Sequence, residues 1–97
     1  MPTYVSLINW TDQGIRGYRD TVQRAESFRE MAGQAGGKVR DIFWTMGEYD
    51  LVAVIEAPDD ETAVGLLLRT SALGNIRTKT MRAMSADEIT AIIGRAG

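Results

Sequence analysis

Runs of apolar residues along the chain predict four β-strands. Residues 3–10, 39–46, 50–56 and 76–84 are rich in β-branched, aromatic and aliphatic side chains, a composition typical of strands. A short loop, Gly47-Glu48-Tyr49, separates the second run from the third. Gly47 can take the positive φ that a tight turn needs. We therefore expect the second and third strands to form a β-hairpin.

Two longer segments carry apolar residues at helical spacing. The first follows Thr11 or Asp12, either of which can act as N-cap, and ends at Gly36-Gly37. Gly14 and Gly17 predict an irregular start, because each glycine costs a helix about 1 kcal/mol relative to alanine. The second helix opens at residues 58–61 and stops at residues 74–75. Its expected apolar face consists of Ala63, Val64, Leu67, Leu68 and Ala72.

A third amphipathic segment closes the chain. Ser85-Ala86-Asp87-Glu88 forms a capping-box pattern, and the helix after it has an apolar face of Ile89, Ile92, Ile93 and Ala96. The element order is β-α-β-β-α-β with a C-terminal helix. This order predicts a single α+β domain over residues 1–97 with the ferredoxin-like fold and a four-stranded antiparallel sheet.

Both faces of the predicted sheet carry bulky apolar side chains. In the first strand Tyr4, Ile8 and Trp10 alternate with Val5 and Leu7. The second strand is expected to place Val39 and Phe43 on one face and Ile42, Trp44 and Met46 on the other, and the third to place Leu51, Ala53 and Ile55 opposite Val52 and Val54. A sheet with one solvated face would alternate strictly between apolar and polar residues. We therefore expect a homodimer or a higher oligomer, with two sheets packed face to face. The alternative is a monomer in which Trp10 and Trp44 cap the rim of the core.

The composition says little about the fold, but it excludes several kinds of reactive site. The 97 residues include no histidine and no cysteine, which removes the usual neutral-pH proton carrier, soft metal ligands and thiol nucleophiles. We expect no metal and no cofactor. A net charge of −2 argues against nucleic-acid binding, and no apolar run is long enough to span a membrane. The N-terminus has no export signal, so we expect a cytoplasmic protein.

Polar and aromatic residues gather where the predicted strands end, and they form a candidate ligand site. Because the first strand and the hairpin are neighbours in this topology, these side chains can converge near one end of the sheet. Aromatic walls with a few hydrogen-bonding groups suit a flat organic ligand. The alternative is that the aromatic side chains fill a core between sheets. The candidate ligand-binding residues are Asn9, Trp10, Trp44, Met46, Tyr49 and Arg77.

A carboxylate in the hairpin and a basic cluster in the fourth strand can each be interpreted as functional or as structural. Asp50, next to Tyr49 in the hairpin, is expected to accept backbone hydrogen bonds in the turn with Gly47, and a general-base role would require burial. Arg77, Lys79 and Arg82 lie in the fourth strand, with the first two on one face. They could bind an anion, protect an edge strand or pair with the acidic run from residue 48 to residue 61.

Several stretches together resemble the GYD domain family. They are residues 43–50 (FWTMGEYD), 56–60 (EAPDD) and 74–78 (GNIRT), together with Tyr4-Val5 and Asn9-Trp10-Thr11 near the start. The resemblance covers nearly the whole chain and includes the hairpin signature of Gly47, Tyr49 and Asp50. It implies a bacterial or archaeal protein of the dimeric α/β-barrel group and no established catalytic residue.

Three functions fit these observations. The first is a homodimer that binds a small organic molecule in an aromatic-lined cavity between sheet and helices. The second is a cofactor-independent monooxygenase or isomerase acting on an aromatic or carbonyl compound. In that case Asn9, Trp10, Trp44, Tyr49 and Arg77 would orient the substrate and stabilise developing charge. The third is a structural or regulatory dimer module.

Overall fold

The computed structural model describes residues 1–97 and contains one four-stranded sheet in the order β2-β3-β1-β4. The strands span Thr3–Trp10 (β1), Lys38–Trp44 (β2), Leu51–Glu56 (β3) and Ile76–Ala83 (β4). The helices span Asp12–Arg16 (α1), Thr21–Gln34 (α2), Asp60–Ala72 (α3) and Ala86–Ala96 (α4), with a 3-10 turn (η1) at Tyr18–Asp20. All predicted strands are therefore present, and their ends shift by at most two residues.

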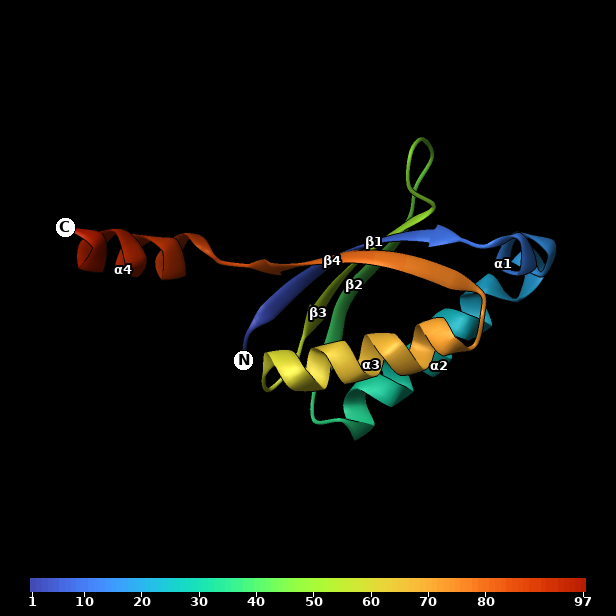
Figure 1. Ribbon diagram of the computed structural model, residues 1–97, viewed down its shortest axis with the longest axis horizontal. Helices are drawn as coiled ribbons and strands as arrows, with labels where there is room; N and C mark the ends of the chain where they lie inside the picture. The colour runs from blue at the N-terminus through green and yellow to red at the C-terminus, as the bar shows by residue number, and fades with distance from the viewer.

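The sheet is built around β1, which pairs antiparallel with both β3 and β4. Its first residue, Thr3, lies opposite Glu56 on one side and Ala83 on the other. Helices α2 and α3 cover one face of the sheet and leave the other without a covering helix (Figure 1). This arrangement confirms the predicted α+β, ferredoxin-like fold. We call the covered side the helix face and the opposite side the open face.

The first predicted helix is divided at its glycines. Thr11 caps α1 by accepting a hydrogen bond from the Gly14 amide at 3.0 Å, and α1 ends at Gly17 after little more than one turn. A Cβ at position 14 would lie 2.0 Å from the carbonyl oxygen of Asn75, so this close approach requires glycine. The chain passes through η1 before α2 begins, which confirms the expected irregular start.

The core lies between the helix face and the two long helices. Leu51, Ala53 and Ile55 of β3 alternate inward and are almost fully buried. The expected apolar face of α3 is partly wrong, because Val64 and Leu68 are 53% and 66% exposed and Ala72 is exposed as well. The buried residues Ala63 and Leu66, together with the half-buried Leu67, set the inward direction, and Val64 and Leu68 follow them by about 100° around the helix.

The expected alternation in β2 is also wrong. The register with β3 shifts between Val39 and Asp41, so one extra residue enters β2 at this bulge. Beyond a bulge the following side chains exchange faces. Val39 is therefore buried on the same face as Ile42 and Trp44, whereas Phe43 is 59% exposed on the open face.

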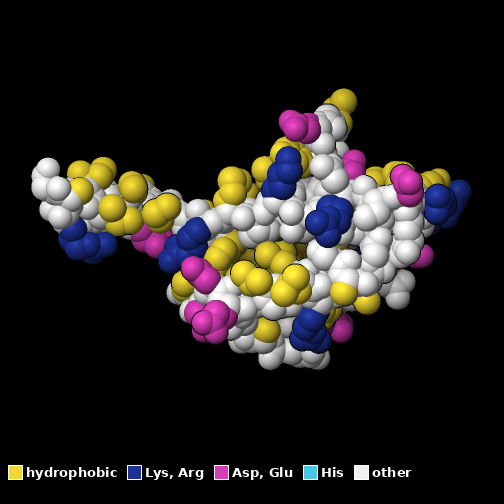
Figure 2. Space-filling view, in the orientation of Figure 1, with side chains coloured by type: hydrophobic (Ala, Val, Ile, Leu, Met, Phe, Trp, Pro, Cys, Tyr) yellow, Lys and Arg dark blue, Asp and Glu magenta, His cyan; other side chains and the backbone are white.

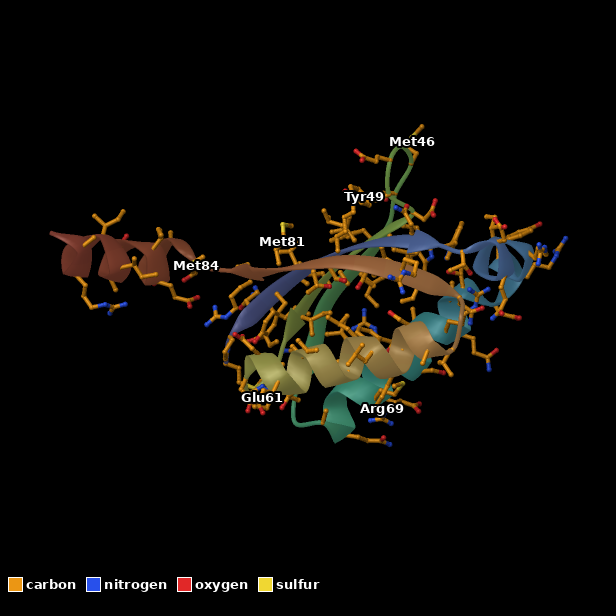
Figure 3. The ribbon with its side chains drawn as sticks, in the orientation of Figure 1. Met46, Tyr49, Glu61, Arg69, Met81 and Met84 are labelled. Atoms are coloured by element: carbon orange, nitrogen blue, oxygen red, sulfur yellow. The ribbon has the colours of Figure 1, made fainter.

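The open face remains apolar without a cover. Side chains that are partners across the strands project from this face, both between β1 and its neighbours β3 and β4 and between β2 and β3. Figure 3 shows Met81 of β4 pointing away from the helices on this side, and the side chain is 49% exposed. The apolar members of the face are Val5, Leu7, Phe43, Val52, Val54 and Met81.

Helix α4 stands away from the rest of the fold. It begins after Ser85, whose hydroxyl and backbone exchange hydrogen bonds with Glu88 in the predicted capping box. Figure 1 shows α4 extending beyond the end of β4, and none of its residues is buried. Apolar side chains gather on one side of it in Figure 2, with Ile89 and Ile93 exposed by 41% and 64%. No helix of the protein is both long and apolar enough to cross a lipid bilayer.

Candidate functional site

A cavity of about 180 Å³ lies between the helix face and helices α2 and α3. Its walls are mainly apolar and come from every layer of the fold. The apolar lining residues are Ile8, Trp10, Ala25, Phe28, Met31, Ile42, Leu51, Ala53, Leu67, Leu73 and Ile76. The polar lining residues are Ser6, Thr21, Arg24, Ser27, Thr70, Asn75 and Thr78.

Small side chains on the central strands leave this space unfilled. Ser6 of β1 and Ala53 of β3 are partners across the sheet, and both are almost fully buried beneath the helices. Ala25 of α2 lies above the same space. Protein interiors are otherwise packed as densely as organic crystals. Three of the lining positions, on three different elements, therefore carry short side chains.

The polar groups on the β4 side of the cavity already have partners. The hydroxyl groups of Ser6 and Thr80 lie 2.8 Å apart across the β1–β4 pair. Asn75 accepts a hydrogen bond from the Gln13 amide at 3.0 Å, and Thr70 donates to the Leu66 carbonyl at 2.8 Å. These contacts fix the lining side chains in place and so preform the polar part of the wall.

Arg24 is the one charged residue of the lining. Its Nη2 donates hydrogen bonds to the carbonyl oxygen of Gly14, at 3.1 Å, and to that of Gly17. The side chain thereby joins α2 to the end of α1. No carboxylate lies within ion-pairing distance of this guanidinium group, since the three ion pairs of the protein involve other arginines.

Two of the predicted site residues lie at the cavity end of the sheet. Trp10 lines the cavity. Trp44 does not, but its indole Nε1 donates to the hydroxyl of Thr21, a lining residue, at 2.9 Å. The backbone N–H of Trp10 donates to Asp50 Oδ2 at 2.9 Å. Asp50 therefore accepts a backbone hydrogen bond, as the turn interpretation requires, but the donor belongs to β1 rather than to the hairpin.

The other predicted site residues lie away from the cavity. Asn9 and Arg77 are partners across the β1–β4 pair, on the open face. Tyr49 lies on the same side in Figure 3, with the Lys79 ammonium 6.0 Å from its ring centre. Met46 is 98% exposed at the tip of the hairpin, beside Gly47, whose φ is +108°. The candidates are thus divided between the two faces of the sheet and do not form one constellation.

One acidic side chain of the run from residue 48 to residue 61 pairs with β4. Arg82 lies 3.5 Å from Asp60, and the same carboxylate oxygen accepts a hydrogen bond from the Tyr4 hydroxyl at 2.5 Å. Burial, followed by the hydrogen bond to Asp60, raises the pKa of Tyr4 above its ordinary value. Tyr4 therefore remains a protonated donor at neutral pH, and the cluster joins β1, α3 and β4.

Several lining residues were not among the candidates predicted from the sequence, and Arg24 is the most important of them. A signal was present, because Thr21, Arg24 and Phe28 recur at helical spacing on α2 and so share one face with the core. Ser6 likewise occupies an inward position of an apolar strand. Neither signal could reveal a cavity, since the space depends on three elements far apart in the chain.

Comparison with known proteins places this fold in a family. The model of the GYD domain matches residues 4–93. A relative from Thermus thermophilus, named glutamine synthetase and cystathionine beta-lyase binding protein, is 28% identical over 92 residues, which are 94% of this chain and 97% of the relative.

Solved structures support the same fold. A protein from Thermus thermophilus superposes with a TM-score of 0.57 at 24% identity, covering 89% of this chain and 96% of that one. The leucine response regulatory protein of Mycobacterium tuberculosis superposes with a TM-score of 0.65 at 18% identity, covering 88% of this chain. This chain spans about half the length of that regulator, 51%. The family match over residues 4–93 confirms the resemblance carried by the hairpin signature, and the chain belongs to the GYD domain family.

Proposed function

We propose that this chain is a homodimeric domain that binds a small organic molecule in the cavity between the helix face and helices α2 and α3. The cavity carries the proposal. Its volume of about 180 Å³ equals roughly six times the 30 Å³ that a molecule of liquid water occupies. It is smaller than the roughly 300–1,000 Å³ of sites for drug-sized ligands. The ligand is therefore about the size of a single ring with a few substituents.

The energetic cost of such a cavity supports a binding role. Unfilled core volume destabilises proteins by about 24 cal/mol per Å³, which for this cavity of about 180 Å³ amounts to about 4 kcal/mol. Water at the mouth lowers this figure, so it is an upper value. Even a fraction of this upper value would be noticeable against the roughly 5–15 kcal/mol that stabilises a typical domain. A ligand that fills the space would recover much of this free energy.

Ligand binding can be tested by thermal unfolding with a panel of single-ring and short branched compounds. We expect at least one compound to raise the Tm of the wild-type protein, because a ligand that binds the folded state stabilises it. Ala53→Leu should abolish this rise by occupying the cavity from β3. Ala72→Leu, at an exposed position of α3, is the matched control and should retain it. A rise that persists in Ala53→Leu, or no rise with any compound, would contradict the proposal.

The homodimer is supported by two apolar surfaces that lack a cover within the chain. Four strands spaced about 4.8 Å apart, each up to eight residues long, make the open face about 500 Å² in extent. The apolar side chains occupy only part of this extent, because Asn9, Arg77 and Lys79 lie on the same face. The largest apolar patches on ordinary monomers measure roughly 300–600 Å². The exposed isoleucines of α4 add a second apolar surface. A stable interface buries roughly 800 Å² per partner, so we expect both surfaces to take part in the dimer.

The dimer proposal predicts different effects of one charge on the two sides of the sheet. Val54→Asp places a carboxylate in the middle of the open face and should shift the protein to monomer in sedimentation experiments. Leu68→Asp is the control, because Leu68 is 66% exposed on α3, on the opposite side, and this variant should remain dimeric. A monomeric wild-type protein at micromolar concentration, or a dimeric Val54→Asp variant, would contradict this mode of assembly.

A second candidate function is binding to a metabolic enzyme, favoured by the name of the Thermus thermophilus relative. That relative aligns along nearly its whole length, 97%, so a similar role for this chain is a specific hypothesis. The projecting hairpin, with Met46 98% exposed, is the contact we would test first. We expect Met46→Glu to weaken binding to the glutamine synthetase of the source organism in titration calorimetry. No heat of binding with the wild-type chain would dismiss this candidate.

A further inference from the structure

We infer that the ligand of the cavity is a small monocarboxylate with an apolar body, and that Arg24 binds its carboxylate. This inference rests on the proposed ligand-binding function and names the class of ligand. It starts from the charge of the lining, in which Arg24 is the one ionised side chain among 18 residues. A cation without a carboxylate partner gives the cavity a positive potential, so an anion is the favoured occupant.

The guanidinium group has hydrogen-bond donors to spare. It carries five N–H donors in a fixed planar fork, and the two carbonyl acceptors from Gly14 and Gly17 are both bound by Nη2. Nε and Nη1 remain free of protein partners. The same two hydrogen bonds hold the plane of the fork, so little conformational entropy is lost when a carboxylate binds.

Neutral donors extend this anion site along α2. Thr21 and Ser27 lie three residues before and after Arg24 and also line the cavity, so the three side chains share one helix face. The Thr21 hydroxyl accepts the Trp44 indole N–H, which leaves its own proton free to donate. A carboxylate at this position can therefore receive charge-assisted and neutral hydrogen bonds together.

The other lining residues determine the apolar part and the total charge of the ligand. Phe28, Leu51 and Ile8 form an apolar wall that suits an aromatic ring or a branched alkyl chain. No second cation lines the cavity, so a dianion would bury an uncompensated charge. No carboxylate lines it either, so the ammonium group of an α-amino acid would have no counter-charge. A monocarboxylic acid without an amino group satisfies all three conditions.

Four compounds of similar size test the inference in titration calorimetry: 3-phenylpropanoate, 3-phenylpropanamide, propylbenzene and L-phenylalanine. We expect wild-type protein to bind the carboxylate at least tenfold more tightly than the amide, because the charged hydrogen bond to Arg24 is lost in the amide. L-phenylalanine should bind more weakly than 3-phenylpropanoate by a similar factor. Equal affinities for the carboxylate, the amide and the hydrocarbon would overturn the inference while leaving a ligand-binding cavity in place. Failure of all four to bind, while a neutral compound of the thermal-unfolding panel raises the Tm, would overturn the inference alone, and failure of the whole panel would contradict the ligand-binding function as well.

Variants of Arg24 provide the second arm. Arg24→Gln should remove the preference for the carboxylate over the amide, whereas Arg69→Gln, on the exposed side of α3, should retain it. Because Arg24 also anchors α1, Arg24→Gln could unfold this end of the protein. Arg24→Lys keeps the charge, and we expect it to keep a reduced preference. A full preference in a folded Arg24→Gln variant would overturn the inference.

Discussion

Replacing Ala53 by leucine is expected to stabilise the protein, although Ala53 lies in a central strand with only 1% of its surface exposed. Ala53 is one of the residues that line the cavity of about 180 Å³ beneath α2 and α3. Leucine adds three carbon atoms, and each buried methylene contributes about 0.8 kcal/mol. The expected gain is therefore about 2 kcal/mol. In a fully packed core the same change would instead cost about 1–3 kcal/mol through strain.

Urea unfolding followed by circular dichroism measures this difference in sign. The experiment needs one fixed protomer concentration, because association adds to apparent stability. Ala72→Leu, on the exposed side of α3, is the control and should change stability by less than about 0.5 kcal/mol. An Ala53→Leu variant that is folded but less stable than the wild type by about 1 kcal/mol or more would refute the reasoning, since it would mean that no usable space lies above β3.

Three further predictions concern the parts of the fold that frame the site. Gly14→Ala should destabilise the protein by more than about 2 kcal/mol in chemical unfolding, because the new Cβ would lie 2.0 Å from a backbone oxygen. Gly33→Ala is the control and should stabilise the protein by up to about 1 kcal/mol, because the space around Gly33 in α2 is open. Similar effects at both positions would be inconsistent with this packing. Asp50→Ala should lower the free energy of unfolding by about 1–3 kcal/mol in the same experiment, because the N–H of Trp10 loses its acceptor. Asp50→Asn should recover most of that loss. An Asp50→Ala variant as stable as the wild type would rule out the contact. The backbone N–H of the N-cap residue Ser85 donates to the Glu88 carboxylate and lowers the pKa of Glu88. The contribution of this cap to α4 is therefore complete above the ordinary glutamate pKa of about 4.3 and is lost as pH falls through the lower folded value. Amide protection factors in α4, corrected for the intrinsic pH dependence of exchange, should fall there in the wild type but not in Glu88→Gln, and an equal fall in both would argue against the cap.

The order of elements could be predicted because each depends on local signals. Thr11, Gly14 and Gly17 predicted a capped and irregular helix start, and the structure divides the helix there. The capping box at Ser85 was equally local. The assignment of β2 side chains to faces failed because the bulge after Val39 is a property of the pairing with β3, not of β2 alone.

The candidate site was harder to predict for a related reason. Asn9 and Trp10 are neighbours in sequence, and strand geometry sends adjacent side chains to opposite faces; Trp10 reaches the cavity and Asn9 the open face. The cavity is lined by Ser6, Ala25 and Ala53, which come from three separate elements. Nothing in the local sequence reports that three small side chains from separate elements will meet.

Because α4 has no contacts that bury it within the chain, its helical order can serve as a measure of association. Isolated helices shorter than about 12–15 residues are marginal in water, and α4 has 11 residues, none of them buried. We therefore expect its helical content to rise when a partner covers Ile89 and Ile93. Amide protection of residues 86–96, followed over a dilution series, would measure how much of that surface is occupied at each concentration. The helical order of the C-terminal segment would thus report the degree of association of the protein in solution.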